Sequence, residues 1–506
     1  MHVIKKNKWW VFLGASLMLF LINLDITVVT LALATIAKDL HTSLVDIQWV
    51  LNSYLLSTMI FFIIGGKLSD IYGRKFIFLI GTFIFGISSL LIGTTSNFTF
   101  LIIGRFIQGI GFAFTISLAL LMITSRFPAR QRGLALGLAI TLTGLGQALG
   151  PTIGGIILQE LNWHWIFLLN VPFSIVSFCI IFFALKKDIA VKRGEKIDIT
   201  GAILLGIALS LLLLTFDTLS GLRFNLKLFI VGLVISFCLL LIFYWKERRT
   251  RFPLIDFKLF GIRDYTLTTF IRFLFMYTYG NFLLFVPLYL QNILGYSPLI
   301  SGLILLIYSA LFGICSPLAG IWCDLVGGYK SPIFSACLFG LLSFILFALI
   351  TVNTSIYLIA FGLLFYGICT GVMVLSSVNA TISSLPVRSV GEGFGMFFTI
   401  AFLGTSLGVA ISGAHMNLLN NFYLNANQHV LKLLNSSEIQ LLHHVANGTR
   451  PISILNISGD ATHFAILKHL ATRSFIHGFS SIMSLNAVLA FIMLIVSIAL
   501  KQRKKI

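Results

Sequence analysis

An acidic residue inside an apolar run is the first candidate for chemistry in this sequence. Asp25 is the only acid that lies deep in any predicted span. An unpaired carboxylate is costly in hydrocarbon, so Asp25 should pair, face a cavity or carry a proton. Burial favours the protonated form of a carboxyl group, which suits a proton carrier. The alternative is a structural hydrogen bond to a neighbouring span.

A basic residue, Arg105, also lies within a predicted span. A buried guanidinium needs an acceptor. If Arg105 binds a deprotonated carboxylate but not a protonated one, the pair couples charge to conformation. The alternative is a permanent contact that holds two helices together.

Membrane spans are the elements that must position these residues. Of 506 residues, 58% are hydrophobic and 10% are charged, which is outside the range of soluble proteins. About 20 apolar residues cross a hydrocarbon core as a helix, and lipid offers no partner for unpaired backbone amides. We therefore expect an all-α polytopic membrane protein. The fourteen predicted spans lie at about 10–34, 46–66, 76–95, 98–122, 133–158, 165–185, 199–217, 227–245, 266–290, 299–319, 331–351, 355–377, 391–414 and 477–500.

The basic residues predict the orientation of the chain. An even number of spans puts both termini on one side, and placing them inside assigns most of the 35 Lys and Arg residues to the inner side. The net charge of +19 is spread over short segments, which argues against a nucleic-acid surface. We expect a multi-pass protein of a bacterial inner or plasma membrane with cytoplasmic termini.

Two related turns predict two related halves. Residues 65–75 follow span 2, and residues 320–330 follow span 10 with Asp324 in the corresponding place. Such parallel repeats predict two six-helix bundles with a substrate site between them. The predicted parts are an N-terminal six-helix bundle (1–185), a cytoplasmic linker (186–198), an extra helix pair (199–245), a cytoplasmic connector (246–265), and a C-terminal six-helix bundle (266–506) with an extracytoplasmic loop at 415–474. The leucine spacing in that loop, at Leu431, Leu434, Leu441 and Leu442, predicts short amphipathic helices that cap the outer face.

The turn at 65–75 combines glycines with charges. We expect Gly65 and Gly66 to end the helix and Gly73 to permit the chain reversal. Positive-inside anchoring is an alternative role for the two basic residues of this turn, but an acid adds nothing to anchoring. Asp70, Arg74 and Lys75 can form a charge network at the inner ends of the helices.

Glycines recur in the fifth predicted span. Gly146, Gly150 and Gly154 lie four residues apart on one helical face, so a neighbouring helix can approach closely. Pro151 removes a backbone hydrogen bond and is expected to kink the helix. The alternative is a glycine-rich face that serves packing alone.

Taken together, these motifs resemble the fourteen-span drug:proton antiporters of the major facilitator superfamily, the EmrB/QacA type, over nearly the whole chain. The matching segments are 24–29 with 32–33, 48–49 with Tyr54, 101–111, 144–155 and 163–172. The sequence departs from the family at Thr30 and Ala34, where asparagine and proline are usual, and at His164, where arginine is usual.

The resemblance implies the major facilitator fold and proton-coupled export of amphipathic or cationic drugs and toxic organic compounds. It implies proton coupling by Asp25 and Arg105. It implies a cytoplasmic gate that comprises Gly66, Asp70, Gly73, Arg74, Lys75 and Asp324. It also implies an antiporter motif made of Gly146, Gly150, Pro151, Gly154 and Gly155. The expected partners are a small amphipathic substrate, protons and membrane lipids. Relatives in two-membrane bacteria work with a periplasmic adaptor protein, which the 415–474 segment is long enough to contact.

The candidate substrate-cavity residues are Tyr54, Gln108, Arg272, Phe275 and Tyr279. Aromatic rings among them can attract flat cations. Arg272 either extends to the inner surface or lines the cavity and disfavours cations. The sequence contains neither a Gly-Lys-Ser/Thr phosphate loop nor metal-ligand spacing, so we expect no cofactor, no metal and no enzymatic activity. Proton-coupled uptake of a small solute and a non-transporting sensor or scaffold remain the alternative functions.

Overall fold

The computed structural model describes residues 7–42, 46–185, 194–220, 226–351, 354–427, 436–447, 452–455 and 461–501. Within these residues the chain forms helices and turns but no strand. Fourteen helical segments among them are long and apolar enough to cross a membrane. The predicted all-helical class with fourteen spans is confirmed.

The helices follow one another in three sets. The first set contains α1 (Lys8–Asp39), α2 (Trp49–Tyr72), α3 (Arg74–Ile92), α4 (Phe98–Arg126), α5 (Arg132–Glu160), and a sixth span made of α6 (His164–Leu168) and α7 (Asn170–Ala184). The extra pair is α8 (Ile199–Ser220) and α9 (Leu226–Arg249). The third set contains α10 (Arg263–Leu288) with a π-helical turn (Tyr289–Ile293), α11 (Pro298–Val326), α12 (Lys330–Ala348), α13 (Ile356–Ser384), α14 (Val390–Ala426), the short α16 (Ser436–Ala446) and α17 (Ala461–Ile498). Single 3-10 turns lie at Asp46–Gln48, Ala129–Gln131, Phe257–Gly261, Val387–Ser389 and Ile452–Leu455.

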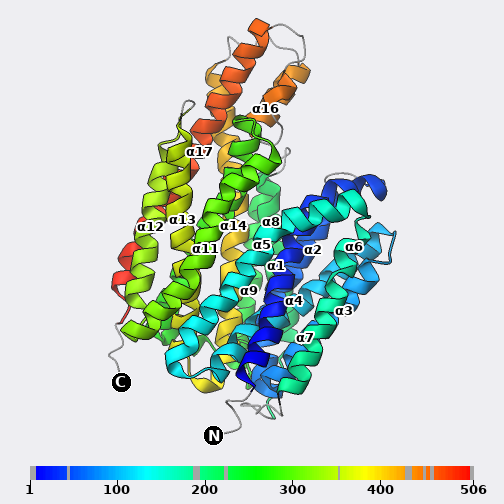
Figure 1. The fold of residues 1–506 in the computed structure, drawn as a ribbon, viewed down its shortest axis with the longest axis vertical. Helices are drawn as coiled ribbons and strands as arrows, with labels where there is room; N and C mark the ends of the chain where they lie inside the picture. The colour runs from blue at the N-terminus through cyan, green and yellow to red at the C-terminus, as the bar shows by residue number, and fades with distance from the viewer. Residues whose placement is uncertain are drawn as a thin grey trace.

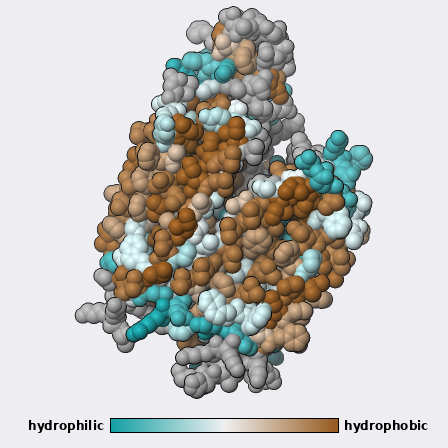
Figure 2. Space-filling view, in the orientation of Figure 1, coloured by the Kyte–Doolittle hydropathy of each residue, from teal (hydrophilic) through white to brown (hydrophobic). Residues whose placement is uncertain are grey.

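The first and third sets form two six-helix bundles (Figure 1), which we call the N-terminal and C-terminal bundles. The blue-to-cyan N-terminal bundle lies beside the green-to-red C-terminal bundle, and both termini lie at the same end of the molecule. The extra helices α8 and α9 pack on each other, and α8 contacts α2 and α14. Brown apolar side chains cover the flanks in Figure 2, as expected of a lipid-facing surface. The exposed apolar residues of the spans include Phe83 and Leu325.

Helix α2 extends beyond the predicted end of the second span. It continues to Tyr72, so Gly65 and Gly66 lie inside the helix, and the expectation that they end it is wrong. Gly66 instead permits a close crossing, because a Cβ at this position would overlap the carbonyl oxygen of Gly391 in α14. The helix ends at Gly73, whose φ of 97° favours glycine over every other residue.

The last two spans are longer than the sequence predicts. Helix α14 continues past residue 414 to Ala426, and α17 begins at Ala461, well before residue 477. The described parts of the segment 415–474 are therefore largely helical. Leu441 and Leu442 lie on the short helix α16, whereas Leu431 and Leu434 lie outside the described residues.

Buried contacts hold this outer segment together, and it projects beyond the other helices in Figure 1. Leu424, Leu442 and Leu470 belong to an apolar cluster separate from the core of the bundles. Asn420 Nδ2 donates to the Ala446 carbonyl oxygen at 2.7 Å, and Ser474 Oγ donates to Asn420 Oδ1 at 2.9 Å. These contacts tie α16 to the ends of α14 and α17. A short helix thus exists at part of the segment where the leucine spacing predicts one, and it packs on the C-terminal bundle.

The two bundles meet at glycine crossings in the half of the molecule that carries the termini. One crossing joins Gly66 of α2 to Gly391 of α14, and the other joins Gly133 of α5 to Gly320 of α11. A Cβ on Gly133 or Gly320 would overlap the carbonyl oxygen of the other glycine. In Figure 1, α5 and α11 diverge from this crossing toward the opposite end. The bundles are therefore closed against each other at the end that carries the termini.

Candidate functional site

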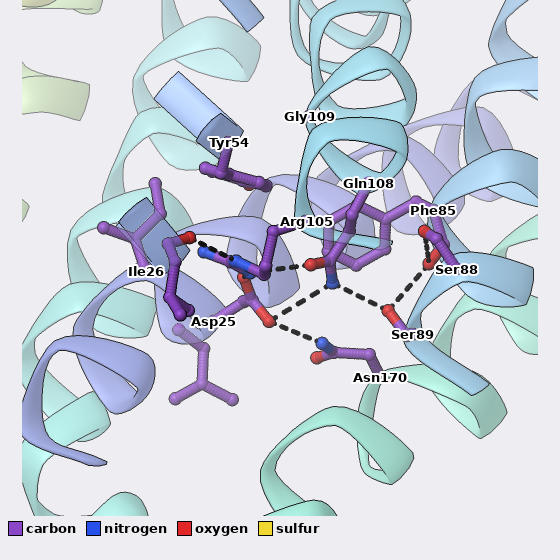
Figure 3. A network of polar contacts seen from close by, with 12 residues as sticks. Asp25, Ile26, Tyr54, Phe85, Ser88, Ser89, Arg105, Gln108, Gly109 and Asn170 are labelled. Carbon is purple, nitrogen blue, oxygen red and sulfur yellow. Dashed lines mark hydrogen bonds and ion pairs between the residues drawn. The ribbon is translucent and has the colours of Figure 1, made fainter. Parts of the chain in front are cut away.

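Asp25 lies at the centre of a buried polar network in the N-terminal bundle (Figure 3). Its Oδ2 accepts a hydrogen bond from Arg105 Nη1 at 2.7 Å. Its Oδ1 accepts from Asn170 Nδ2 at 2.7 Å and from Gln108 Nε2 at 3.4 Å. All four side chains are at most 1% exposed, and they come from α1, α4 and α7. In this conformation the carboxylate is fully paired inside one bundle.

Arg105 makes further contacts that fix its position. Its Nη1 also donates to Gln108 Oε1 at 2.6 Å, and its Nε donates to the Val50 carbonyl oxygen at 3.0 Å. The guanidinium lies 4.1 Å from the ring centroid of Tyr54, close enough for cation–π attraction. Its Nη2 is buried with no hydrogen-bond partner among the described residues. A change in the charge of Asp25 would therefore leave Arg105 with neutral acceptors alone.

Small residues bring the helices of this network together. A Cβ on Gly109 would overlap the Tyr54 carbonyl oxygen, so glycine is needed where α4 crosses α2. On α3, Ser89 Oγ accepts a hydrogen bond from Gln108 Nε2 at 2.7 Å and donates one to the Phe85 carbonyl oxygen at 2.7 Å. These contacts orient the Gln108 amide so that its oxygen faces Arg105.

Two aspartates join the bundles at the end that carries the termini. Asp70, near the end of α2, accepts from the backbone N–H groups of Gly391 (3.1 Å) and Glu392 (3.0 Å) at the start of α14. Asp324, near the end of α11, accepts from the N–H of Gly133 at the start of α5, with its nearer oxygen at 3.0 Å. A carboxylate is stabilised at a helix N-terminus by unpaired N–H groups and by the helix dipole. The two related turns therefore make the same contact, each with the opposite bundle.

The basic residues of the first turn lie elsewhere. Lys75 Nζ donates to the Phe182 carbonyl oxygen at 2.8 Å and to that of Leu185, so it binds the end of α7 in its own bundle. Arg74 is partly exposed at the start of α3. The structure thus brings Asp70 to the opposite bundle, whereas these two hydrogen bonds of Lys75 lie within its own bundle.

A buried charge cluster beside this turn is missed by sequence reasoning. Lys67 is 2% exposed, and its Nζ lies 3.1 Å from Glu195 Oε2 and 3.4 Å from Glu392 Oε2. The Asp256 N–H donates to Glu392 Oε1. The cluster therefore joins α2 and α14 to the linker and the connector that flank the extra helix pair. Charges at the ends of apolar runs resemble ordinary topology signals, so no pattern distinguishes them.

The linker also contacts the extra helix pair through Asp198. Its Oδ1 accepts from the Gly201 N–H at 2.9 Å, and its Oδ2 pairs with Lys246 of α9. Burial would raise the pKa of Asp198, but the hydrogen bonds from Lys246 and Gly201 hold that pKa well below its usual range. Asp198 is therefore charged at neutral pH and anchors α8 to α9.

The glycine face of α5 lies against α1. A Cβ on Gly146 would overlap the Phe20 carbonyl oxygen, one on Gly150 would overlap Thr27 Oγ1, and one on Gly154 would lie 2.9 Å from a Val28 methyl group. Since α1 carries Asp25, this face sets the position of the helix that holds the carboxylate.

Gly155 and Pro151 are the other two residues of the predicted antiporter motif. A Cβ on Gly155 would have nothing within 4 Å, so this glycine makes no close approach. Helix α5 continues through Pro151, whose side chain lies outside the described residues.

This contrast provides a matched pair of substitutions. Gly150→Ala is expected to lower the free energy of unfolding by about 1–3 kcal/mol, because overpacking at a close helix crossing forces the helices apart. Gly155→Ala should leave the stability unchanged or slightly higher, since alanine is the better helix former. Melting curves of the two purified variants test this. Equal melting temperatures would contradict the close packing of α5 on α1.

The five candidate cavity residues fall into two places. Tyr54 and Gln108 belong to the Asp25 network and are fully buried. Arg272, Phe275 and Tyr279 lie on α10 in the C-terminal bundle.

Within α10, Arg272 is 5% exposed, and its Nη1 donates to Ser377 Oγ of α13 at 3.3 Å. It therefore points into the bundle and does not extend to the inner surface. Tyr279 OH donates to Gln147 Oε1 of α5 at 3.3 Å, which places Tyr279 at the interface between the bundles.

Sequence reasoning missed two polar residues, one in the Asp25 network and one beside it on α1. Asn170 contacts the carboxylate directly, and Asn23 Oδ1 accepts from Gln147 Nε2 at 3.4 Å. Both are amide side chains within apolar runs, and that signal could have identified them.

The fold and the site define a polytopic membrane transporter. Residues 15–409 match the sequence profile of the Major Facilitator Superfamily. Because this match covers most of the chain, the protein belongs to that superfamily.

Individual relatives carry different names. The chain is 29% identical over 408 residues to the riboflavin transporter RibZ of Clostridioides difficile, covering 80% of this chain and 87% of that protein. It is 35% identical over 300 residues to multidrug resistance protein 3 of Bacillus subtilis, covering 58% of each chain. The solved structure of the proton:xylose symporter XylE has a TM-score of 0.58 at 14% identity, over 96% of this chain and 95% of that one, and shares the fold.

Proposed function

We propose that this protein exports amphipathic organic compounds from the cytoplasm in exchange for protons, as a fourteen-span drug:proton antiporter. The observation that carries the proposal is the buried pair of Asp25 and Arg105, 2.7 Å apart in the N-terminal bundle. Similarity to a multidrug resistance protein supports the export direction. A scaffold protein would gain nothing from a buried ion pair of this kind.

Protonation of Asp25 is the proposed coupling step. A proton on the carboxyl group removes the negative charge that balances the Arg105 guanidinium. An uncompensated charge in a dry site is unfavourable, so the network prefers a different arrangement in each protonation state. A difference of this kind shifts the balance between two conformations of the transporter.

A separate chain of hydrogen bonds joins the two bundles beside this network. Asn23 lies two residues before Asp25 on α1 and accepts from Gln147 on α5. Gln147 in turn accepts from Tyr279 on α10. A shift of α1 against α5 would therefore change a contact between the bundles, at the level where the substrate is expected.

The helix-capping aspartates are the proposed gate. Asp70 and Asp324 hold the bundles together at the end that carries the termini. The excess of basic residues in the segments predicted to lie inside supports a cytoplasmic location for that end. Opening toward the cytoplasm breaks both contacts. An adaptor protein at the outer segment remains a prediction from the family resemblance.

Drug-triggered proton release tests the proposal. Everted vesicles with a preset pH gradient and a pH-sensitive dye receive a panel of amphipathic aromatic compounds that includes anionic, neutral and cationic members such as ethidium. We expect the native chain to collapse the gradient and Asp25→Asn to reduce the response at least tenfold, because the variant has no carboxyl group to titrate. Asp46→Asn, at an exposed acid outside the network, is the control. Equal collapse by Asp25→Asn and the native chain would remove Asp25 from its role.

A second candidate function is proton-coupled uptake of a small organic solute. The similarity to a riboflavin transporter over 80% of the chain favours it. In right-side-out vesicles with an inward proton gradient, uptake predicts accumulation of riboflavin or a related solute. Export predicts no accumulation and exclusion of the tested drugs.

A further inference from the structure

We propose that Arg272 binds a negatively charged group of the transported compound, so that aromatic organic anions are preferred over cations. This inference rests on the proposed transport function and adds the substrate class. It concerns the C-terminal bundle, whereas the proposed proton site lies in the N-terminal bundle.

The first argument is the lack of a countercharge at Arg272. Asp25 already balances Arg105, but no described acidic residue forms an ion pair with Arg272. The Arg272 side chain is 5% exposed, its hydrogen bond to Ser377 is 3.3 Å long, and its Nε is buried without a partner among the described residues. A buried guanidinium in this condition is costly. A carboxylate or sulfonate of a ligand would supply the missing acceptors and the countercharge.

The distribution of buried charges also argues against a cationic substrate. The acid deep in the spans, Asp25, is held by Arg105 and Asn170 inside the other bundle and is not available to a ligand in this state. A cation beside Arg272 would meet a like charge in a region of low dielectric constant.

The second argument is the row of aromatic residues beside the charge. Arg272, Phe275, Tyr279 and Phe282 recur at helical spacing and share one face of α10. The guanidinium lies 5.6 Å from the centroid of Phe275, whose ring stacks on Tyr279 at 6.0 Å. Because Tyr279 reaches Gln147 of the N-terminal bundle, this face extends from the charge to the interface between the bundles.

The buried row of aromatic rings continues beyond Tyr279. The ring of Phe282 lies 4.1 Å from that of Tyr366 and 5.2 Å from that of Tyr308. The hydroxyl groups of both tyrosines are buried without a hydrogen-bond partner among the described residues. Rings combined with free hydroxyl groups suit a flat compound that carries polar substituents. An acidic group at one end of such a compound would match Arg272.

Two dyes with the same ring system and opposite charge test the proposal. Fluorescein is an anionic xanthene and rhodamine 123 a cationic one, and fluorescence anisotropy reports their binding to the purified full chain in detergent. We expect the native chain to bind fluorescein at least tenfold more tightly than rhodamine 123. Arg272→Gln should weaken fluorescein binding about tenfold to a hundredfold, the usual effect of losing a charged hydrogen bond. Arg272→Lys should retain part of the affinity.

The control is Arg248→Gln, which removes the same charge from an exposed position on α9 and should bind both dyes like the native chain. Equal affinities, tighter binding of rhodamine 123, or no binding of fluorescein by the native chain would each overturn the proposal, whether or not the variants fold. The assay needs no proton gradient. Fluorescein binding without proton release in vesicles would therefore contradict the proposed antiport and leave the anion site standing.

Discussion

Replacing Arg105 with glutamine is expected to destabilise the folded protein by about 3–5 kcal/mol and to abolish coupled transport. Removal of one partner from a buried ion pair leaves the other charge uncompensated, and this cost exceeds the net contribution of the pair. Asp25 would keep its hydrogen bond from Asn170 but lose the guanidinium at 2.7 Å. Thermal unfolding of the purified protein measures the first effect, and drug-triggered proton release measures the second.

The double variant Asp25→Asn/Arg105→Gln separates stability from coupling. With both charges removed, most of the lost stability should return, whereas proton release should stay absent. Arg126→Gln on the same helix, at a partly exposed position, is the control for loss of a positive charge. A double variant no more stable than Arg105→Gln alone would show that Asp25 is not the partner that matters to Arg105.

Gly66→Val is expected to force the bundles apart at the end that carries the termini. The valine side chain would overlap the backbone of α14 at Gly391, and a backbone cannot move aside as a flexible side chain can. We expect the balance between closed and open states to shift by about 3 kcal/mol, which is about a hundredfold. Spin labels at Tyr72 and Val387, both exposed and in different bundles, should report a longer distance.

The control for this substitution is Gly302→Val on α11. A Cβ at Gly302 has nothing within 4 Å, so valine there should leave the label distance and the transport rate close to native. A Gly66→Val protein with an unchanged distance distribution would mean that the crossing of α2 and α14 does not hold the closed state.

The spans could be predicted because each is a long apolar run, and lipid forces such a run into a helix. The ends of α14 and α17 could not. Both helices leave the apolar region and continue through polar residues such as Asn420 and Ser474, whose hydrogen bonds to each other and to Ala446 replace lipid burial. Hydropathy therefore predicts the apolar part of each helix but not the residue at which the helix ends.

The candidate site could also be predicted only in part from the sequence. A carboxylate and a guanidinium inside apolar runs each need a partner, so the sequence predicts that both Asp25 and Arg105 are special. It does not reveal partners far apart in the chain, such as Asn170, which is 145 residues from Asp25, or Glu392, which is 325 residues from Lys67. The partners of Asp70 are backbone N–H groups, which every residue except proline carries, so no sequence pattern marks them.

The length of α14 has a mechanical consequence. Its 37 residues make a helix about 56 Å long, whereas a hydrocarbon core is about 30 Å thick. The C-terminal part of α14, which exceeds the thickness of the bilayer, projects at the end opposite the termini. It contacts α16, and both α14 and α17, on which α16 packs, belong to the C-terminal bundle. Because displacement grows with distance from the axis of rotation, a small tilt of one bundle against the other moves α16 sideways by more than it moves the helices within the bilayer. An antibody fragment bound to α16 could follow or block the transport cycle without entering the membrane.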